Sequence, residues 1–424
     1  MTLQTPKGMR DFNPEEKILR NEIVRTLTEI FELYGYVPLE TPIVERYDVL
    51  SAKFAAGEES DVLKEIFKLK DQGNRELGLR FDLTVPLARY IAMNQDLKMP
   101  FKRFQTGEVF RDGPIKLGRY REFWQCDADA IGVKSVLAEY ELIKIALDFF
   151  KEMNFDAYIQ VNNRKLVEGI LIDSGIKENE MQSAMISIDK HEKIGLKGVL
   201  EEMKKSNIND KAINNIKRFL SIEDVEKIEK IIKNDIAKQG LNELKELFKL
   251  FSKKERKNIQ FRLSLVRGFS YYTGTVFEGF LRKNEIKSSI CGGGRYDNMI
   301  GNYMEEKKEV PAVGISFGLD TIADAIKIKA KKTNVKVYLI PIKTEDKTLK
   351  IIEELRKNKI NSDMDMGQRN LSKNLDYANK LDIPYVLIIG NKEIKMRKYT
   401  LRDMKTGKEQ MLDIKKIIKK LCNF

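Results

Sequence analysis

Three segments of the 424-residue sequence collect arginine and acidic residues in apolar surroundings. They read LRFDLTVPLARY (79–90), FRDGPIKLGRYREFWQCDAD (110–129) and LVRGFSYYTGTVFE (265–278). A buried arginine needs an anionic partner, because an unpaired charge away from water is costly. Several arginines that converge on one sheet would suit a multiply charged ligand such as a nucleoside triphosphate. An internal ion-pair network accounts for the same composition equally well, so both interpretations stay open on composition alone.

The second segment has a spacing that suits nucleotide binding. Arg111 is followed by GRYREF, which contains Arg119 and Arg121, and then Phe123. This order is typical of a strand, a loop and a second strand, in which an arginine grips a phosphate and an aromatic ring stacks on a base. The sequence contains no GxxxxGK[ST] motif, so the phosphates are not held by a P-loop.

The number of histidines limits which catalytic mechanisms are possible. The only histidine is His191, in the lysine-rich segment SIDKHEKIG. A Ser-His-Asp triad, a histidine-rich metal site or a histidine base would each need His191 itself, whereas a lone histidine among lysines is typical of a solvated surface. We therefore expect the chemistry to use arginine, lysine, carboxylates, tyrosine and backbone groups.

Cysteine usage and hydropathy indicate a reduced, cytoplasmic protein. Cys126, Cys291 and Cys422 lie far apart and never in CxxC spacing, so neither a disulfide framework nor a metal site is predicted. No stretch approaches the roughly 18 apolar residues of a membrane span, and the start MTLQTPKGMRDF lacks the apolar core of a signal peptide. The length predicts two or three domains, each with its own core.

The net charge of +13 is concentrated at one end of the chain. Residues 331–424 contain 23 Lys and Arg against 12 Asp and Glu, a balance of +11. A basic module on a nearly neutral body suggests a polyanion partner, and RNA fits better than a membrane because no basic amphipathic helix with Trp or Phe is present. A generally lysine-rich composition is the alternative explanation.

Periodicity indicates the elements that position these residues. Asn13 can cap a helix that begins at Pro14 and continues with apolar residues at helical spacing as far as Tyr34. YVPLETPIVE (36–45) is expected to be extended because two prolines exclude a helix interior. Strand-like runs between Gly78 and Gly132 predict a mainly antiparallel sheet, and a helix over 137–153 follows.

The second half of the chain divides into three parts. Residues 163–257 have helical periodicity and almost no strand pattern, which predicts a helical insertion. PAVGISFGLDTIADAI (311–326) turns from strand into helix, and IKAKKTN (328–334) is a plausible linker to alternating strands and helices. We predict an α+β fold: a catalytic core over 1–162 and 258–326, an insertion over 163–257 and a C-terminal α/β domain over 334–424.

Five motifs occur in an order that identifies a family. They are KGMRDF, FR with GRYREF six residues later, LVRG followed by YY and TVFE, GGGRYD, and PAVG with FGL. Together they resemble the motifs of class II aminoacyl-tRNA synthetases, specifically the histidyl-tRNA synthetase family, and YVLIIG and TLRDMKTG are similar to its anticodon-binding domain. The resemblance implies a homodimeric ligase that activates histidine with ATP, accompanied by Mg²⁺, and transfers it to the 3′ end of tRNA(His).

The resemblance also implies roles for individual residues. Arg111 would contact the α-phosphate of ATP, and Arg267 would reach the same phosphate and the carboxylate of histidine from the opposite side. Phe123 would stack on adenine, with Arg119 and Arg121 as further ATP contacts. The implied histidine site consists of Asp82, Thr84, Gln125, Asp129, Tyr271 and Tyr272, of which Thr84 also fits a nucleotide contact. The glycines 292–294 would let the backbone approach the substrate closely.

Two positions depart from the family pattern. The third motif of the class normally ends in an acidic residue and an arginine that covers adenine and touches the terminal phosphate, but Asp320 is followed here by Thr321. Ser270 stands where the family more often has an acid. The loss of the arginine favours a regulatory paralogue that supports histidine biosynthesis, whereas the paired tyrosines and the basic C-terminal module favour an active ligase. An RNA-binding protein without catalysis would leave the arginines without a purpose.

Overall fold

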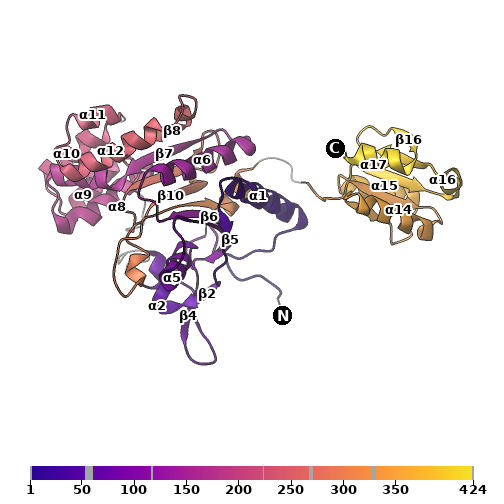
Figure 1. Cartoon of the computed structure of the whole chain (residues 1–424), viewed down its shortest axis with the longest axis horizontal. Coiled ribbons are helices and arrows are strands. Elements are labelled where there is room, and N and C mark those ends of the chain that lie inside the picture. The colour runs from indigo at the N-terminus through magenta and orange to yellow at the C-terminus, as the bar shows by residue number, and fades with distance from the viewer. Residues whose placement is uncertain are drawn as a thin grey trace. The chain divides into compact units, whose positions relative to one another are not determined.

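The computed structural model describes residues 2–52, 61–115, 118–222, 224–266, 271–326 and 331–422. The chain divides into two compact units, each drawn in Figure 1. The first comprises Met1–Arg10 and Ile23–Lys327, and the second comprises Asp11–Glu22 and Ile328–Phe424. The segment 11–22 therefore groups apart from the rest of the predicted 1–162 core. Within the described residues, no helix is both long and apolar enough to cross a membrane.

An eight-stranded sheet forms the centre of the first unit. Its strand order is β1-β5-β6-β11-β10-β9-β7-β8, and only the outer pairs β1/β5 and β7/β8 are parallel. The strands are β1 (Val37–Pro38), β5 (Phe101–Phe110), β6 (Glu122–Ile131), β11 (Ala312–Gly318), β10 (Cys291–Arg295), β9 (Thr275–Leu281), β7 (Ala157–Asn163) and β8 (Ile259–Phe261). The predicted antiparallel sheet is thus confirmed, and its inner strands come from both halves of the catalytic sequence.

Helices cover one face of this sheet. They are the part of α1 (Pro14–Leu33) that belongs to this unit, from Ile23 onward, and α6 (Leu137–Glu152), which packs across β6, β11, β10, β9 and β7. At the start of α1, the Glu16 N–H donates to the capping Asn13 side chain at 2.9 Å. Phe31 of α1 and Phe149 of α6 both pack against Phe317, at ring-centroid distances of 6.1 and 5.2 Å. Because strand side chains alternate between faces, the residues that flank Phe317 in β11 point to the opposite face.

A small sheet and a helix lie beside the first strands. The sheet has the order β2-β4-β3, with β2 (Val44–Arg46), β4 (Glu76–Leu79) and β3 (Lys68–Lys70), and it neighbours the short helices α2 (Tyr47–Leu50) and α4 (Asp61–Lys64). The helix α5 (Thr84–Met93) lies between the strand-like runs from which the antiparallel sheet was predicted. Its residues include Val85 and Tyr90, which favour strands, but the Asp82 carboxylate, just before the helix, accepts the Val85 N–H of the first turn at 3.0 Å.

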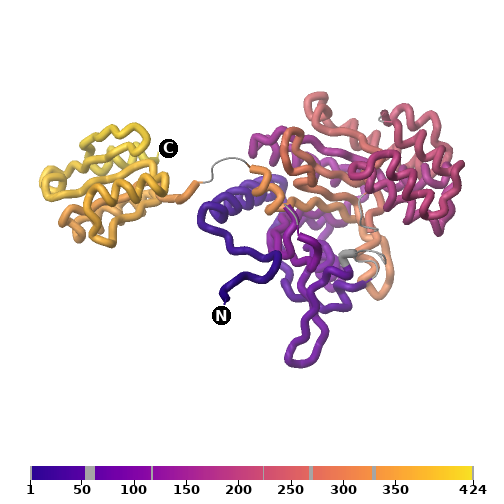
Figure 2. Tube along the Cα trace, turned by 180° about the vertical axis from the view of Figure 1, so that it is seen from behind, coloured from indigo at the N-terminus to yellow at the C-terminus, as the bar shows by residue number. Residues whose placement is uncertain are grey.

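The insertion is helical, as its periodicity predicts. It contains α7 (Arg164–Ser174), α8 (Met181–Asp189), α9 (His191–Lys205), α10 (Asp210–Leu220), α11 (Val225–Glu229) and α12 (Asp235–Lys249), with 3₁₀ turns at Glu178–Glu180 and Glu255–Asn258. Figure 2 shows these helices gathered at one end of the first unit. Gly240 is required where α12 crosses α7, because a Cβ there would lie 2.4 Å from the backbone nitrogen of Leu166. The unit ends with a 3₁₀ turn at Gly301–Tyr303 and the helix α13 (Leu319–Ala325).

The second unit contains a mixed five-stranded sheet. Its order is β13-β12-β14-β15-β16, parallel among the first three strands and antiparallel among the last three. The strands are β12 (Val337–Pro341), β13 (Ser362–Met364), β14 (Tyr385–Ile389), β15 (Tyr399–Asp403) and β16 (Glu409–Leu412), and the helices are α14 (Glu345–Lys357), α15 (Leu371–Lys380), α16 (Asn391–Met396) and α17 (Ile414–Cys422). Separate hydrophobic clusters pack around Leu339 and Tyr338, which face opposite sides of β12. The predicted α/β domain is confirmed.

Candidate active site

The hairpin formed by β5 and β6 brings Arg111 and Phe123 together. Ten residue pairs join the strands, from Phe101 opposite Ile131 to Phe110 opposite Glu122. The ladder continues where Arg111 N–H donates to the carbonyl of Arg121 at 2.8 Å. The Arg111 guanidinium lies 5.1 Å from the centroid of the Phe123 ring, and its Nε donates to the Phe81 carbonyl at 3.0 Å. The strand–loop–strand geometry predicted from the spacing is therefore present.

Strand β6 presents three polar side chains to one face. Gln125, Asp127 and Asp129 alternate with residues buried toward α1 and α6, and all three line one cavity. Gln125 Nε2 donates to Ser316 Oγ of β11 at 2.8 Å. Arg103, with no exposed surface, pairs with Asp129 at 2.8 Å. Since the two residues are opposite each other in the β5–β6 register, the strand pairing itself positions this ion pair.

The floor of the cavity is acidic and buried. Burial raises the pKa of Asp82 to about 6 and that of Asp127 to about 7. Burial also raises the pKa of Asp129, although the Arg103 guanidinium and the Tyr296 hydroxyl, which donates to Asp129, act in the opposite direction. The three carboxyls face two guanidinium groups, with Arg111 near Asp82 and Arg103 near Asp127 and Asp129. Such an excess of carboxyls favours a cationic group.

Asp82 is placed by the start of α5. Its Oδ1 accepts the Val85 N–H, and its Oδ2, buried at the cavity wall, has no hydrogen-bond partner among residues 2–52, 61–115, 118–222, 224–266, 271–326 and 331–422. Thr84, the first residue of α5, also lines the cavity. A buried acceptor without a partner costs about 1–3 kcal/mol, so Oδ2 is suited to a ligand's donor.

Tyrosines and glycines form another wall of the cavity. The rings of Tyr271 and Tyr272 lie 4.8 Å apart, and Tyr271 meets Tyr296 edge-on at 6.1 Å. In β10, a Cβ at Gly293 would lie 1.9 Å from the Gly314 carbonyl oxygen, and one at Gly294 would lie 2.9 Å from the Tyr272 ring. The glycines therefore allow β10 to pack against β11 and against the tyrosine that lines the site.

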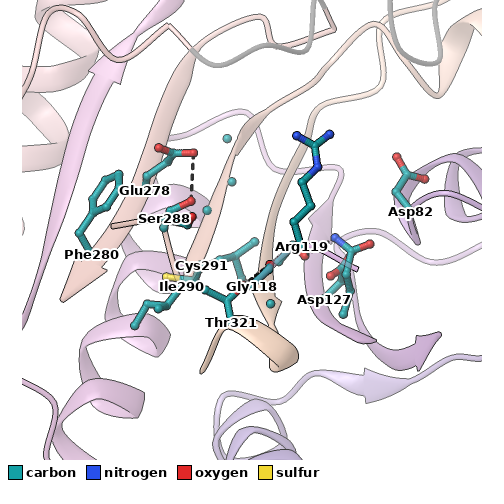
Figure 3. A pocket seen from close by; sticks show the side chains of 18 of the residues that line it. Asp82, Gly118, Arg119, Asp127, Glu278, Phe280, Ser288, Ile290, Cys291 and Thr321 are labelled. Carbon is teal, nitrogen blue, oxygen red and sulfur yellow. Dashed lines mark hydrogen bonds between the residues drawn. The ribbon is translucent and has the colours of Figure 1, made fainter. Parts of the chain in front are cut away.

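These walls enclose one cavity of about 760 Å³. Of the predicted site residues, the structure brings together Asp82, Thr84, Arg111, Arg119, Phe123, Gln125, Asp129, Tyr271 and Tyr272. In Figure 3, Arg119 stands between Asp82 on one side and Glu278 and Phe280 on the other. The Arg119 guanidinium lies 3.6 Å from Glu65 and is half-exposed, so it can reach a ligand without breaking a buried contact.

Of the predicted arginines with a described placement, Arg121 does not stand with this group. The side chain of Arg121 is not among those that line the cavity in the described part of the chain, because its guanidinium pairs with Asp112 at 2.8 Å and donates to the Gly113 carbonyl at 3.3 Å. Its aliphatic part packs over Gly8, which has a positive φ of 83°. A direct contact of Arg121 with ATP finds no support in this placement. Arg267 and Ser270 lie outside the described residues.

Asp320 and Thr321, near the start of α13, contact β6 and the loop that precedes it. Asp320 accepts the Trp124 N–H at 2.9 Å and pairs with Arg10 at 2.8 Å. The Thr321 hydroxyl donates to the Gly118 carbonyl at 3.4 Å, and Thr321 lines the cavity. The residue that replaces the expected arginine is therefore at the site, but its short side chain contacts the hairpin and brings no charge.

Sequence reasoning missed several residues of the cavity. Asp127 lies two positions from both Gln125 and Asp129, so strict alternation along β6 would have found it. Tyr296 belongs to the GGGRYD motif, although no role was assigned to it. No local signal distinguished Ser316 or Gln160, because their strands reach the site only through sheet pairing.

Comparisons with known proteins agree with this geometry. Residues 8–322 match the family described as histidyl-tRNA synthetase, and residues 336–423 match the anticodon binding domain. Histidine–tRNA ligase 1 of Bacillus cereus is 43% identical over 421 residues, 98% of each chain. Histidine–tRNA ligase of Clostridium tetani is 36% identical over 436 residues, which cover 98% of this chain and 97% of its own. The crystal structure of histidyl-tRNA synthetase from Nostoc has a TM-score of 0.87 at 30% identity, covering 100% of this chain and 99% of that one.

The arginine-bearing hairpin on an antiparallel sheet is the catalytic fold of class II aminoacyl-tRNA synthetases. Within that class, the chain belongs to the histidyl-tRNA synthetase family, and the prediction of an aminoacyl-tRNA ligase that uses ATP as a substrate is confirmed. A Bacillus halodurans structure described as an ATP phosphoribosyltransferase regulatory subunit/histidyl-tRNA synthetase has a TM-score of 0.77 at 24% identity, which shows a shared fold alone. Nothing in these comparisons favours the regulatory paralogue.

Proposed function

We propose that the cavity converts histidine and ATP to histidyl-adenylate and diphosphate, and that the chain then transfers the histidyl group to the 3′ end of tRNA(His), releasing AMP. The observation that carries the proposal is the meeting of Arg111 and Arg119 with the acidic floor in one cavity. The cations suit the phosphates, and the carboxyls suit the ammonium group of an amino acid. A volume of about 760 Å³ is within the usual range for a small-molecule site.

The arginines are the proposed catalytic residues. In the activation step, the histidine carboxylate attacks the α-phosphorus of ATP, the bond to the diphosphate breaks, and negative charge develops on the phosphoryl oxygens. Arg111, held by the Phe81 carbonyl and the Phe123 ring, is oriented to donate to those oxygens, and Arg267 is proposed to donate from the other side. One such donor contributes on the order of 3 kcal/mol to transition-state stabilisation. Phe123 would also carry the adenine ring.

The acidic residues are proposed to recognise histidine. The free Oδ2 of Asp82 would accept from the α-ammonium group, and Gln125 and Asp129 would pair with the imidazole. Arg103 and Tyr296 hold Asp129 in one orientation. An apolar side chain in place of the imidazole would leave the buried Gln125 Oε1, which has no hydrogen-bond partner within the described residues, without a donor. Tyr271 and Tyr272 would enclose the bound amino acid.

Mg²⁺ is proposed to accompany ATP and to neutralise part of its phosphate charge. Over the described ranges, no three acidic, histidine or cysteine residues form a group that could hold a metal ion. We therefore assign no metal cage to this part of the chain and no step to protein-bound metal.

Two further regions are proposed to bind tRNA. The C-terminal module, with its balance of +11, would contact the anticodon arm, and the loop from Asp112 to Leu117 would meet the acceptor end. A cytoplasmic location is proposed because tRNA and ATP are both available there.

We also propose that the chain works as a homodimer. Four large apolar side chains near the first family motif are exposed: Leu33 at 80%, Val37 at 49%, Ile43 at 40% and Val44 at 43%. Covering such a patch with a second copy would remove apolar surface from water. Sedimentation velocity measures the state directly, and a fully active monomer at nanomolar concentration would contradict this proposal.

Histidine-dependent exchange of diphosphate into ATP tests the activation step, and charging of tRNA(His) tests the transfer. The proposed enzyme performs both reactions and discriminates against other amino acids. A protein that binds tRNA but exchanges no diphosphate would exclude the proposed activity and favour a non-catalytic role.

A further inference from the structure

The loop between β9 and β10, residues 282–290, lies along the helix that carries Thr321. Asn284 Nδ2 donates to the Ala325 carbonyl at the end of α13, at 3.0 Å. At the other end of the loop, the Ile290 carbonyl accepts the Gly318 N–H just before α13, at 3.1 Å. The loop is therefore bonded at Asn284 and at Ile290 to the two ends of the segment that contains α13.

This loop supplies a lysine to the cavity wall. Lys287, Ser288 and Ser289 line the same cavity as Thr321, and Figure 3 shows Ser288, Ile290 and Thr321 among its labelled lining residues. Lys287 is exposed, and in the described part of the chain no carboxylate lies within ion-pair distance of its Nζ. Its charge is thus available to a ligand.

Thr321 is neutral, so this wall of the cavity lacks the positive charge that an arginine would bring at that position. An ATP molecule whose α-phosphate is at Arg111 still requires a cation for its terminal phosphates. Arg119 projects from the hairpin, and of the described residues of α13 only the neutral Thr321 lines the cavity, while its neighbour Asp320 pairs with Arg10. The nearest elements with a lysine at the cavity are the β9–β10 loop, with Lys287, and the insertion helix α9, with Lys193.

Resting on the proposed function, we infer that Lys287 supplies the positive charge for the terminal phosphates of ATP that Thr321 cannot supply. Lys287 lines the same cavity as Thr321, and the residues that flank it in the loop, Asn284 and Ile290, are bonded to the two ends of the α13 segment. Lys193, in contrast, follows Glu192, which pairs with Arg262 at 2.6 Å and ties that part of α9 to the segment after β8. Lys287 and Thr321 would then be two linked differences from the family pattern: the helix α13 lacks the positive charge, and the β9–β10 loop carries it instead.

The test compares Lys287→Ala with Lys283→Ala, which removes an exposed lysine of the same loop that is not among the cavity-lining residues. Equilibrium binding of ATP and the KM values for ATP and histidine in diphosphate exchange are measured for each. Lys287→Ala should weaken ATP binding and raise the KM for ATP about tenfold or more, because a charged hydrogen bond is lost. The KM for histidine should stay within about twofold, and Lys283→Ala should behave as the parent.

A rescue variant separates a charge effect from a structural one. In Lys287→Ala combined with Thr321→Arg, a guanidinium projects from α13, and ATP binding should recover most of its loss. Lys287→Arg should retain parental affinity. Lys287→Ala with unchanged ATP affinity, or an equal loss in Lys283→Ala, would overturn the inference, as would a loss found in Lys193→Ala instead. If the parent binds ATP but exchanges no diphosphate with histidine, the proposed function fails, while the ATP-binding comparison still decides the role of Lys287.

Discussion

Asp82→Asn tests the histidine site with the least structural disturbance. The amide oxygen of asparagine can still accept the Val85 N–H, so the first turn of α5 keeps its cap. Only the charge at the buried Oδ2 is lost. If Asp82 binds the α-ammonium group, the variant loses a charged hydrogen bond worth about 1.5–3 kcal/mol, which corresponds to a roughly 13- to 160-fold higher KM for histidine. The KM for ATP should change little.

The thermal stability of Asp82→Asn provides a control, because the direction of its change relative to the parent follows from the pKa of Asp82. Burial raises the pKa of Asp82 to about 6 in the folded protein, above its ordinary value of 3.8. The folded state therefore binds the proton more tightly, and the contribution of this group to stability is lost as the pH rises through about 6. Asparagine does not ionise, so at about pH 8 the variant should melt no earlier than the parent.

The assay is histidine-dependent diphosphate exchange at saturating ATP, repeated between about pH 5 and pH 8. In the parent, histidine affinity should fall as Asp82 takes up a proton near its pKa of about 6, and this component should vanish in Asp82→Asn. Because the imidazole of free histidine titrates in the same range, the difference between parent and variant is the informative quantity. A KM for histidine within about twofold of the parent, with normal melting, would refute the assignment.

Three further outcomes are expected. The difference in melting temperature between Asp127→Asn and the parent should increase in favour of the variant by a few degrees as the pH rises from about 5 to 8. In the parent, the folded pKa of Asp127 is raised to about 7, so its stabilising contribution is lost over that range. Calorimetry that shows no pH-dependent difference would contradict this. Arg267→Ala should slow adenylate formation at least about a hundredfold in single-turnover experiments without changing circular dichroism, and activity within about threefold of the parent would exclude the two-arginine arrangement. A chain truncated after Thr333 should retain diphosphate exchange but charge tRNA poorly, with the slope of log K against log salt lowered by roughly 0.7–0.9 for each phosphate contact removed; unchanged charging and slope would mean that the basic module is merely surface.

Local patterns were sufficient to predict many elements of this protein. The cap at Asn13, the strands that became β5 and β6, and the strand-to-helix turn before Asp320 depend on nearest-neighbour chemistry and on side-chain alternation. The order of the five motifs identified the family, because each motif preserves residues that are close in sequence. The site residues on these motifs could therefore be named from the sequence.

Other features depended on packing between distant segments. The stretch from Thr84 to Met93 contains residues with strand preference, yet a cap at Asp82 and burial of its apolar side make it helical. Arg121 has the same local surroundings as Arg119, but pairing with Asp112 turns it from the cavity while Arg119 lines it. Residue type could not separate these two arginines, because their directions are set by the partners that the fold provides.

The sequence by itself determined which chemical groups are available and which family they belong to. The tertiary structure alone decided that Arg103 pairs with Asp129, that Asp127 joins the floor of the cavity, and that the loop bearing Lys287 lies beside Thr321. Those contacts join residues that are separated in the sequence, and Asp127 in addition stands opposite Ser316 of the distant strand β11. The strand register is set by burial of one sheet face against α1 and α6. Long-range register is a property of the packed sheet, so no local pattern in the chain encodes it.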